Sequence, residues 1–140
     1  MGNVCGSPIG TLLARIEECL LPDDREVLLD IMEEIQGRVS SIVGKKGASQ
    51  NFVLAKGVPC VLNAMRTMLQ DDVVLRLGVA IFDYQKDNRE CMVQFITNGG
   101  LIVLEDTLTQ HPMDGTLSAL IPVLQKYVRG LCSSTADCCY

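Results

Sequence analysis

Two stretches decide the fold: FVLAKGVPCVLNAMRTMLQ at residues 52–70 and FITNGGLIVLEDTLTQ at residues 95–110. They align when the chain is shifted against itself by 43 residues, which places Phe52 opposite Phe95 and Gly57 opposite Gly100. Further identities follow downstream, where Asp71 meets Asp114, Leu77 meets Leu120 and Tyr84 meets Tyr127. A shared glycine before one helix and a shared aspartate before the next favour an internal repeat over chance matching of apolar residues.

The apolar residues recur at spacings of three and four, which is the signature of amphipathic helices. No stretch alternates strictly between apolar and polar residues, as a half-buried strand would. The Asp23-Asp24 pair is placed to cap a second helix that ends near Gly44 and Gly47, and Gly44-Lys45-Lys46-Gly47 is expected to be a solvated loop. The sequence therefore predicts an all-α fold, with helices centred on residues 12–20, 28–42, 58–69, 74–84, 92–96, 101–108 and 117–131.

A period of about 43 residues lies in the range of armadillo and related repeats. The two opening stretches resemble the armadillo pattern of a short first helix, a glycine and an apolar second helix. The stretches DDVVLRLGVAIFDY (71–84) and DGTLSALIPVLQKY (114–127) resemble its third helix. An earlier partial repeat is expected over residues 6–36, where Gly6 and Pro8 echo Gly57 and Pro59 and Asp23-Asp24 echo Asp71-Asp72. The resemblance implies a right-handed, armadillo-like stack of about two and two-thirds repeats, which binds other proteins through its surface.

This chain departs from peptide-binding armadillo proteins, whose third helix presents an Asn to the groove with a Trp one turn before it. Asp83 and Lys126 stand at the Asn positions, and Val79 and Pro122 stand at the Trp positions. A ladder of amides that holds an extended peptide is therefore not expected. The candidate interaction surface consists instead of charged residues on and after the two third helices: Arg76, Asp83, Lys86, Lys126 and Arg129.

The N-terminus, MGNVCGSPIG, resembles the start of dually acylated peripheral membrane proteins. Gly2 suits N-myristoylation after removal of Met1, although Gly6 replaces the usual Ser or Thr. One myristoyl chain gives only reversible membrane binding, on the order of 10⁴ M⁻¹, so a second signal is required. Residues 1–22 carry one basic residue, Arg15, and no polybasic cluster. Cys5 is therefore the expected site of a second, palmitoyl chain.

Composition and hydropathy argue against a nucleic-acid-binding, a membrane-spanning or a secreted protein. The net charge of −5 and the pI of about 4.7 argue against nucleic-acid binding, which needs a positive patch. No apolar run is long enough for a membrane-spanning helix and no secretory signal is present, so a cytosolic location is expected. In a reducing compartment, Cys19, Cys60 and Cys91, which lie within apolar helical patterns, are predicted to be buried free thiols.

Neither a metal centre nor a catalytic site is indicated. Cys132, Cys138 and Cys139 lack the spacing of a zinc site, and the single histidine, His111, precedes Pro112 in an expected loop. Gly37 and Gly44 are separated by six residues where a phosphate-binding loop needs four. We therefore expect no metal, no cofactor and no enzymatic activity.

The sequence thus predicts three parts: an acylated segment (1–7), an armadillo-like domain (8–131) and a flexible cysteine-containing tail (132–140). Its expected function is that of a non-enzymatic, lipid-anchored adaptor for protein partners on the cytosolic face of a membrane. One alternative is a soluble helical-repeat subunit of a cytosolic complex, and a weaker one is a small enzyme or thiol-redox protein. Leu77 and Leu120 are expected at equivalent buried positions, and residues 117–131 are expected to leave apolar surface for self-association or a partner.

Overall fold

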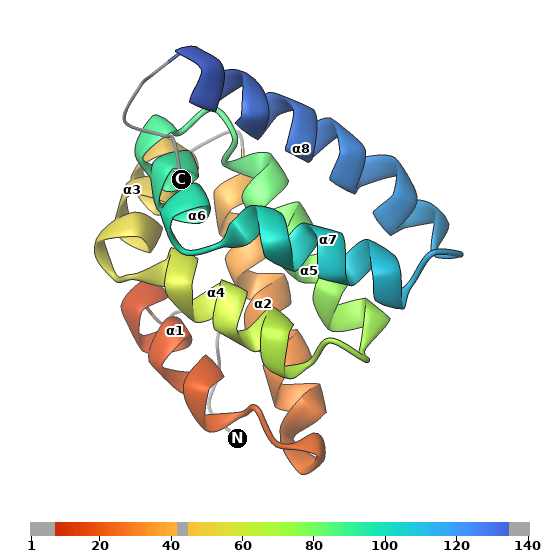
Figure 1. Ribbon diagram of the computed structural model, residues 1–140. Coiled ribbons are helices and arrows are strands. Elements are labelled where there is room, and N and C mark those ends of the chain that lie inside the picture. Colours follow the sequence, from red (N-terminus) through yellow and green to blue (C-terminus); the bar gives the residue numbers. More distant parts are fainter. Residues whose placement is uncertain (1–7, 42–44, 135–140) are drawn as a thin grey trace.

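The computed structural model describes residues 8–41 and 45–134 (Figure 1). Within these ranges the chain forms helices and no strand, so the all-α prediction is confirmed. In chain order the elements are α1 (Ile9–Glu18), the 3-10 helix η1 (Pro22–Asp24), α2 (Arg25–Ser40), α3 (Lys45–Leu54), α4 (Gly57–Thr67), α5 (Asp72–Tyr84), α6 (Arg89–Thr97), α7 (Gly100–Gln110) and α8 (Gly115–Ser134).

The helices pack in three rows. In one row α2 contacts α5 and α5 contacts α8, in the second α1 contacts α4 and α4 contacts α7, and in the third α3 contacts α6. In Figure 1, α4 and α7 lie in front of α2 and α5. The second-row helices α4 and α7 begin 43 residues apart, at Gly57 and Gly100, and also end 43 residues apart. The 43-residue shift therefore aligns α3 with α6, α4 with α7 and α5 with α8, and each of these pairs lies in one row.

The two shared glycines have a steric reason to be glycine. A Cβ atom at Gly57 would lie 2.6 Å from the ring of Phe52, and one at Gly100 would lie 2.5 Å from the ring of Phe95. Both contacts are far shorter than ordinary van der Waals contact, so each ring packs directly on the backbone at the start of the following helix. The residues that match at the 43-residue shift therefore make the same ring-on-glycine contact in two places.

Three phenylalanines, one each on α3, α5 and α6, pack together in the core. Phe82 on α5 contacts Phe52 in an edge-on arrangement with ring centroids 6.3 Å apart. It also contacts Phe95 on α6, with centroids 4.8 Å apart. All three side chains are fully buried. Each such aromatic pair stabilises a protein by about 0.5–1.5 kcal/mol beyond the burial of its apolar area. Phe82 therefore links α3 to α6 through the core.

The aspartates at positions 71 and 114 are helix caps. Asp71 accepts hydrogen bonds from the backbone N–H groups of Val73 and Val74, at 3.1 and 3.3 Å. Asp114 accepts one from the backbone N–H of Leu117 at 3.0 Å. These bonds satisfy N–H groups that the first helical turn leaves without partners. The caps fix where α5 and α8 begin.

The prediction of a loop at residues 44–47 is wrong for residues 45–47, which are helical. Helix α3 begins at Lys45, so Lys46 and Gly47 belong to its first turn, while Gly44 lies outside the described residues. Glycine lowers helix propensity, but helices in proteins are stabilised mainly by packing of their apolar face. Phe52 and Val53 are buried on the far end of α3 and supply that packing.

Two other boundaries differ from expectation. Pro8 is the N-cap of α1, whereas Pro59 is the third residue of α4, so the predicted echo between these prolines is wrong. Gly6 lies outside the described residues. Helix α8 continues to Ser134, three residues past the expected domain end at 131, and contains Pro122 within it as predicted.

Polar residues replace buried apolar ones on the side of α7 and α8 that no later described helix covers. Leu62, Leu75 and Phe82 are fully buried, because α7 and α8 cover α4 and α5. Their counterparts 43 residues later are Glu105, Ser118 and Gln125, of which Glu105 and Ser118 are exposed. The apolar residues Leu117, Ile121, Leu124 and Val128 all point inward and are fully buried. Within residues 117–131, Val123 and Tyr127 remain exposed, so this range does leave some apolar surface, as predicted.

Leu77 and Leu120 occupy equivalent positions on α5 and α8 but are only partly buried. Both pack against the core and keep one side toward solvent. The prediction of equivalence holds, and the prediction of full burial is wrong.

Candidate interaction surface

The two lipidation residues predicted from the sequence, Gly2 and Cys5, lie outside the described residues. The described chain starts at Pro8, which is exposed and directly precedes α1. No helix within residues 8–41 and 45–134 is long and apolar enough to cross a membrane.

Partly buried and exposed apolar side chains recur at matching positions along α5 and α8. Spacings of three and four place the members of each row on one side of their helix. The exposed fractions are 40% for Tyr84, 40% for Tyr127 and 55% for Val123. The helices contact each other, and the rows match at the 43-residue shift. We call this surface the α5–α8 face: Leu77, Ala80 and Tyr84 on α5, with Leu120, Val123 and Tyr127 on α8.

Sequence reasoning missed this surface because it assigned the same apolar periodicity to the core. The 43-residue alignment already paired Leu77 with Leu120 and Tyr84 with Tyr127. Periodicity alone does not show which of two apolar stripes on a helix is covered. The distinguishing feature is burial: Leu75, Val79 and Phe82 on α5 are fully buried, whereas the stripe one step away is not.

The predicted charged residues divide between two places. Arg76 bridges the beginnings of α5 and α8, because its guanidinium lies 2.5 Å from the Asp72 carboxylate and 3.5 Å from that of Asp114. Asp83 pairs with Lys86 at 3.4 Å beside Tyr84. These three residues therefore flank the α5–α8 face.

The other two predicted residues lie on α8. Lys126 is exposed and precedes Tyr127, so it also borders the α5–α8 face. Arg129 lies 3.7 Å from Glu105 on α7, which places it on the polar end of the stack. The structure thus brings four of the five predicted residues to one surface and separates Arg129 from them.

An acidic row on α2 extends this surface. Glu26, Asp30 and Glu33 are exposed and separated by four and three residues, so they follow one line along the helix. Helix α2 packs beside α5. At the start of α2, Arg25 donates from Nε and Nη2 to the carboxylate of Asp71, the N-cap of α5, at 2.5 and 3.2 Å. The Arg25 guanidinium lowers the pKa of Asp71, so this pair stays ionised over the neutral range.

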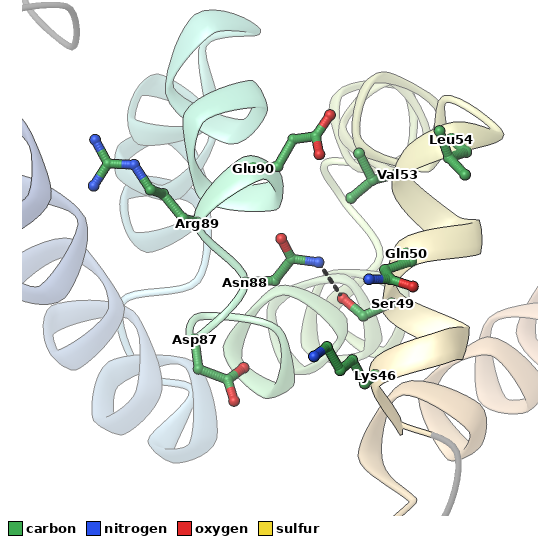
Figure 2. Close-up of a pocket in the computed structure, with 9 residues that line it drawn as sticks. All are labelled: Lys46, Ser49, Gln50, Val53, Leu54, Asp87, Asn88, Arg89 and Glu90. Carbon is green, nitrogen blue, oxygen red and sulfur yellow. Dashed lines mark hydrogen bonds between the residues drawn. The ribbon is translucent and has the colours of Figure 1, made fainter.

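A pocket of about 700 Å³ lies between α3 and α6 (Figure 2). At its base the Asn88 amide donates to Ser49 Oγ at 2.7 Å, and Ser49 in turn donates to Gln85 Oε1 at 2.7 Å. The Gln85 amide donates to the Ile81 carbonyl at 3.1 Å. These partners satisfy one another, and neither histidine nor cysteine is among the lining residues: Lys46, Ser49, Gln50, Val53, Leu54, Asp87, Asn88, Arg89 and Glu90. The network joins α3 to the connection between α5 and α6.

In the described part of the chain, the histidine is held by a hydrogen bond and three cysteines are buried in the core. His111 lies in a loop, as predicted, and its Nε2–H donates to the Leu69 carbonyl at 2.9 Å. Cys19, Cys60 and Cys91 are buried free thiols, which confirms the prediction. Burial raises the pKa of Cys60 and of Cys91 to about 12, so neither forms much reactive thiolate at neutral pH. Over the described ranges no three His, Cys, Asp or Glu side chains are grouped to hold a metal ion.

Comparison with protein-family models, with curated proteins and with solved structures finds no match to this chain. The α5–α8 face with its charged border is the feature of the described residues on which the proposed function rests.

Proposed function

We propose that the chain is an armadillo-like, right-handed helical stack of about two and two-thirds repeats, and that it works as a non-enzymatic adaptor. The α5–α8 face is the observation that carries this proposal. It repeats similar apolar side chains on adjacent helices, ends each row in a tyrosine and is bordered by charge, as protein-binding surfaces are. The order of helices and their row-wise contacts support the repeat assignment.

The chemistry of the face indicates the kind of partner. Its apolar rows suit a segment that presents apolar side chains along one side, such as an amphipathic helix. The acidic row on α2 favours basic residues at the edge of that segment, in line with the net charge of −5. The proposed partner is therefore a protein with a basic, amphipathic segment.

A substitution on the face tests this assignment. Val123→Glu places a charge among the tyrosines and should abolish capture of the partner in affinity purification from the native cell. Ile102→Glu is the matched control, because Ile102 is similarly exposed, at 64%, but lies on α7. The assignment fails if both variants recover the same proteins as the unmodified chain.

We further propose that acyl chains on Gly2 and Cys5 hold the protein on the cytosolic face of a membrane. The charges of α1 support the need for two chains. Glu17 and Glu18 are exposed on this helix and Arg15 is its one basic residue, so α1 does not supply the basic patch that attracts anionic lipid. Acyl chains would then have to supply the membrane affinity themselves.

Cell fractionation of two variants tests the anchor. Gly2→Ala should release the protein wholly, because without myristate it would seldom reach the membranes where palmitoyl transfer occurs. Cys5→Ser should leave intermediate, readily exchanged binding, and hydroxylamine, which cleaves thioesters, should reproduce it. A Gly2→Ala protein that stays on membranes would contradict the anchor. An unmodified protein that is fully soluble in cells would favour the alternative of a soluble helical-repeat subunit.

A further inference from the structure

A second pocket, of about 590 Å³, opens between the beginning of α1 and the length of α3. Its walls come from three segments that are distant in sequence. Helix α1 and its N-cap supply Pro8, Ile9 and Gly10, the end of α2 supplies Arg38, and α3 with the residue after it supplies Ala48, Asn51, Leu54 and Ala55. We call it the α1–α3 pocket.

The arrangement of helices explains why this side is open. Helix α6 packs on α3, on α4 and on α7. A helix that preceded α3 in the same row would pack on α3 and α1, and no helix among the described residues lies there. Leu54 is consequently 77% exposed.

The lining is apolar and small. Six of the eight lining residues are Pro, Ile, Gly, Ala or Leu. A Cβ atom at Gly10 would lie 3.7 Å from the Cβ of Ala55, so α1 and the end of α3 approach closely at one side of the pocket. The volume falls within the range of about 300–1,000 Å³ that is usual for small-ligand sites. The α1–α3 pocket therefore suits a narrow apolar ligand better than a polar one.

The polar lining residues are consistent with a ligand that carries no charge. Arg38 donates from Nε to the Glu34 carboxylate at 2.9 Å, so its guanidinium already has an acidic partner on α2. Asn51 is exposed at the rim. An acyl chain in amide linkage fits this lining, because it brings neither a carboxylate nor a headgroup. Eight lining residues are also far fewer than the roughly 20–30 per side of a stable protein interface.

The connectivity of the chain selects one occupant. Pro8 is both the N-cap of α1 and a wall of the pocket. Only residues 3–7 separate it from Gly2, and five residues span at most about 18 Å when extended. An acyl chain on Gly2 is therefore tethered beside the pocket at high local concentration.

We propose that the α1–α3 pocket holds the acyl chain of Gly2 whenever the protein is off the membrane. This inference rests on the proposed acylation of Gly2 and adds a regulatory step to it. The chain exchanges between the pocket and the bilayer, so the affinity for membranes is reduced by the fraction of molecules in which the pocket is filled. Any event that closes the pocket would then drive the protein onto the membrane.

The test uses the full chain, prepared with and without N-terminal myristate, with the modification established by intact mass. Asn51→Trp blocks the α1–α3 pocket from an exposed position on α3. Gln50→Trp is the matched control, since the adjacent Gln50 is also exposed but lines the α3–α6 pocket. Sedimentation with phosphatidylcholine vesicles measures membrane binding, and thermal melting without vesicles measures whether the chain stabilises the folded protein.

Myristoylated Asn51→Trp should bind vesicles more tightly than the unmodified sequence, by about tenfold if nine in ten molecules hold the chain in the pocket. Gln50→Trp should bind as the unmodified sequence does. Myristate should raise the melting temperature of the protein without substitutions and of Gln50→Trp, but not that of Asn51→Trp. If Asn51→Trp does not fold, Leu54→Asp places a charge in the wall from a highly exposed position and should act in the same way.

Two failures are distinguishable. Equal vesicle binding by all myristoylated variants, with no effect of myristate on melting, would overturn the pocket proposal and leave the anchor intact. Absence of the acyl chain from Gly2 in protein isolated from its native cell would overturn the anchor and the pocket proposal together.

Discussion

Replacing the two shared glycines by alanine probes the packing that defines the repeat. In Gly57→Ala and Gly100→Ala the new Cβ atoms would lie 2.5–2.6 Å from the nearest carbons of the Phe52 and Phe95 rings. Both rings are fully buried and Phe82 packs on each, so neither can move freely. Overpacking of this kind costs about 1–3 kcal/mol, while alanine returns up to about 1 kcal/mol of helix propensity. We expect each variant to lose about 1–2 kcal/mol of unfolding free energy.

Urea unfolding followed by circular dichroism measures this change, with Gly37→Ala as the matched control. Gly37 is exposed in the interior of α2, and a Cβ there would meet nothing within 4 Å. That variant should gain about 0.5–1 kcal/mol. Phe95→Leu combined with Gly100→Ala should cost less than the sum of the two single changes, because the ring that obstructs the methyl group is gone. Gly57→Ala and Gly100→Ala proteins as stable as the Gly37→Ala control would refute the reasoning.

Three further outcomes are expected. Leu77→Ala and Leu120→Ala should each lose less than about 2 kcal/mol in the same urea assay, below the range for fully buried leucines, because both side chains are only partly buried; losses above 3 kcal/mol would contradict this. Asp71→Asn keeps the cap but weakens the pair with Arg25, so it should be less stable than the unmodified sequence at pH 7. Because the folded state lowers the pKa of Asp71, that difference should be present above the unfolded pKa of about 3.9 and decline as pH falls through the folded value, which a series of melts at decreasing pH would show. Cys91 should resist a thiol reagent at pH 8 until urea unfolds the chain, and rapid labelling of the native protein would argue against its raised pKa.

Local features of the fold could be predicted from the sequence because they depend on neighbours in the chain. The 3.6-residue periodicity located the helices, and the pairs Gly57/Gly100 and Asp71/Asp114 marked where helices begin. The start of α3 was missed because its first turn contains Lys46 and Gly47, and burial of Phe52 further along outweighs their weak propensity.

Features that depend on which helix covers which surface were harder to predict. The α5–α8 face and the core use the same kinds of residue at the same spacing, so only the position of α8 beside α5 separates Leu77 from Leu75. The α1–α3 pocket joins Gly10, Arg38 and Ala55, and no local pattern relates these three positions. The change from Leu62 to Glu105 was visible in the 43-residue alignment and could have indicated the polar end.

The polar end has a consequence for how copies of this protein share a crowded surface. A stack whose last unit offered the same leucines and phenylalanine as the unit before it could accept the first helices of another copy, and such head-to-tail contacts grow into open filaments. Confinement to a bilayer would raise the local concentration and favour that growth. Glu105, Ser118 and Gln125 remove the apolar match, and Arg129 pairs with Glu105 across the same end. Under the proposed membrane anchoring, copies that meet at this end therefore find no apolar surface there that matches the first helices of another copy.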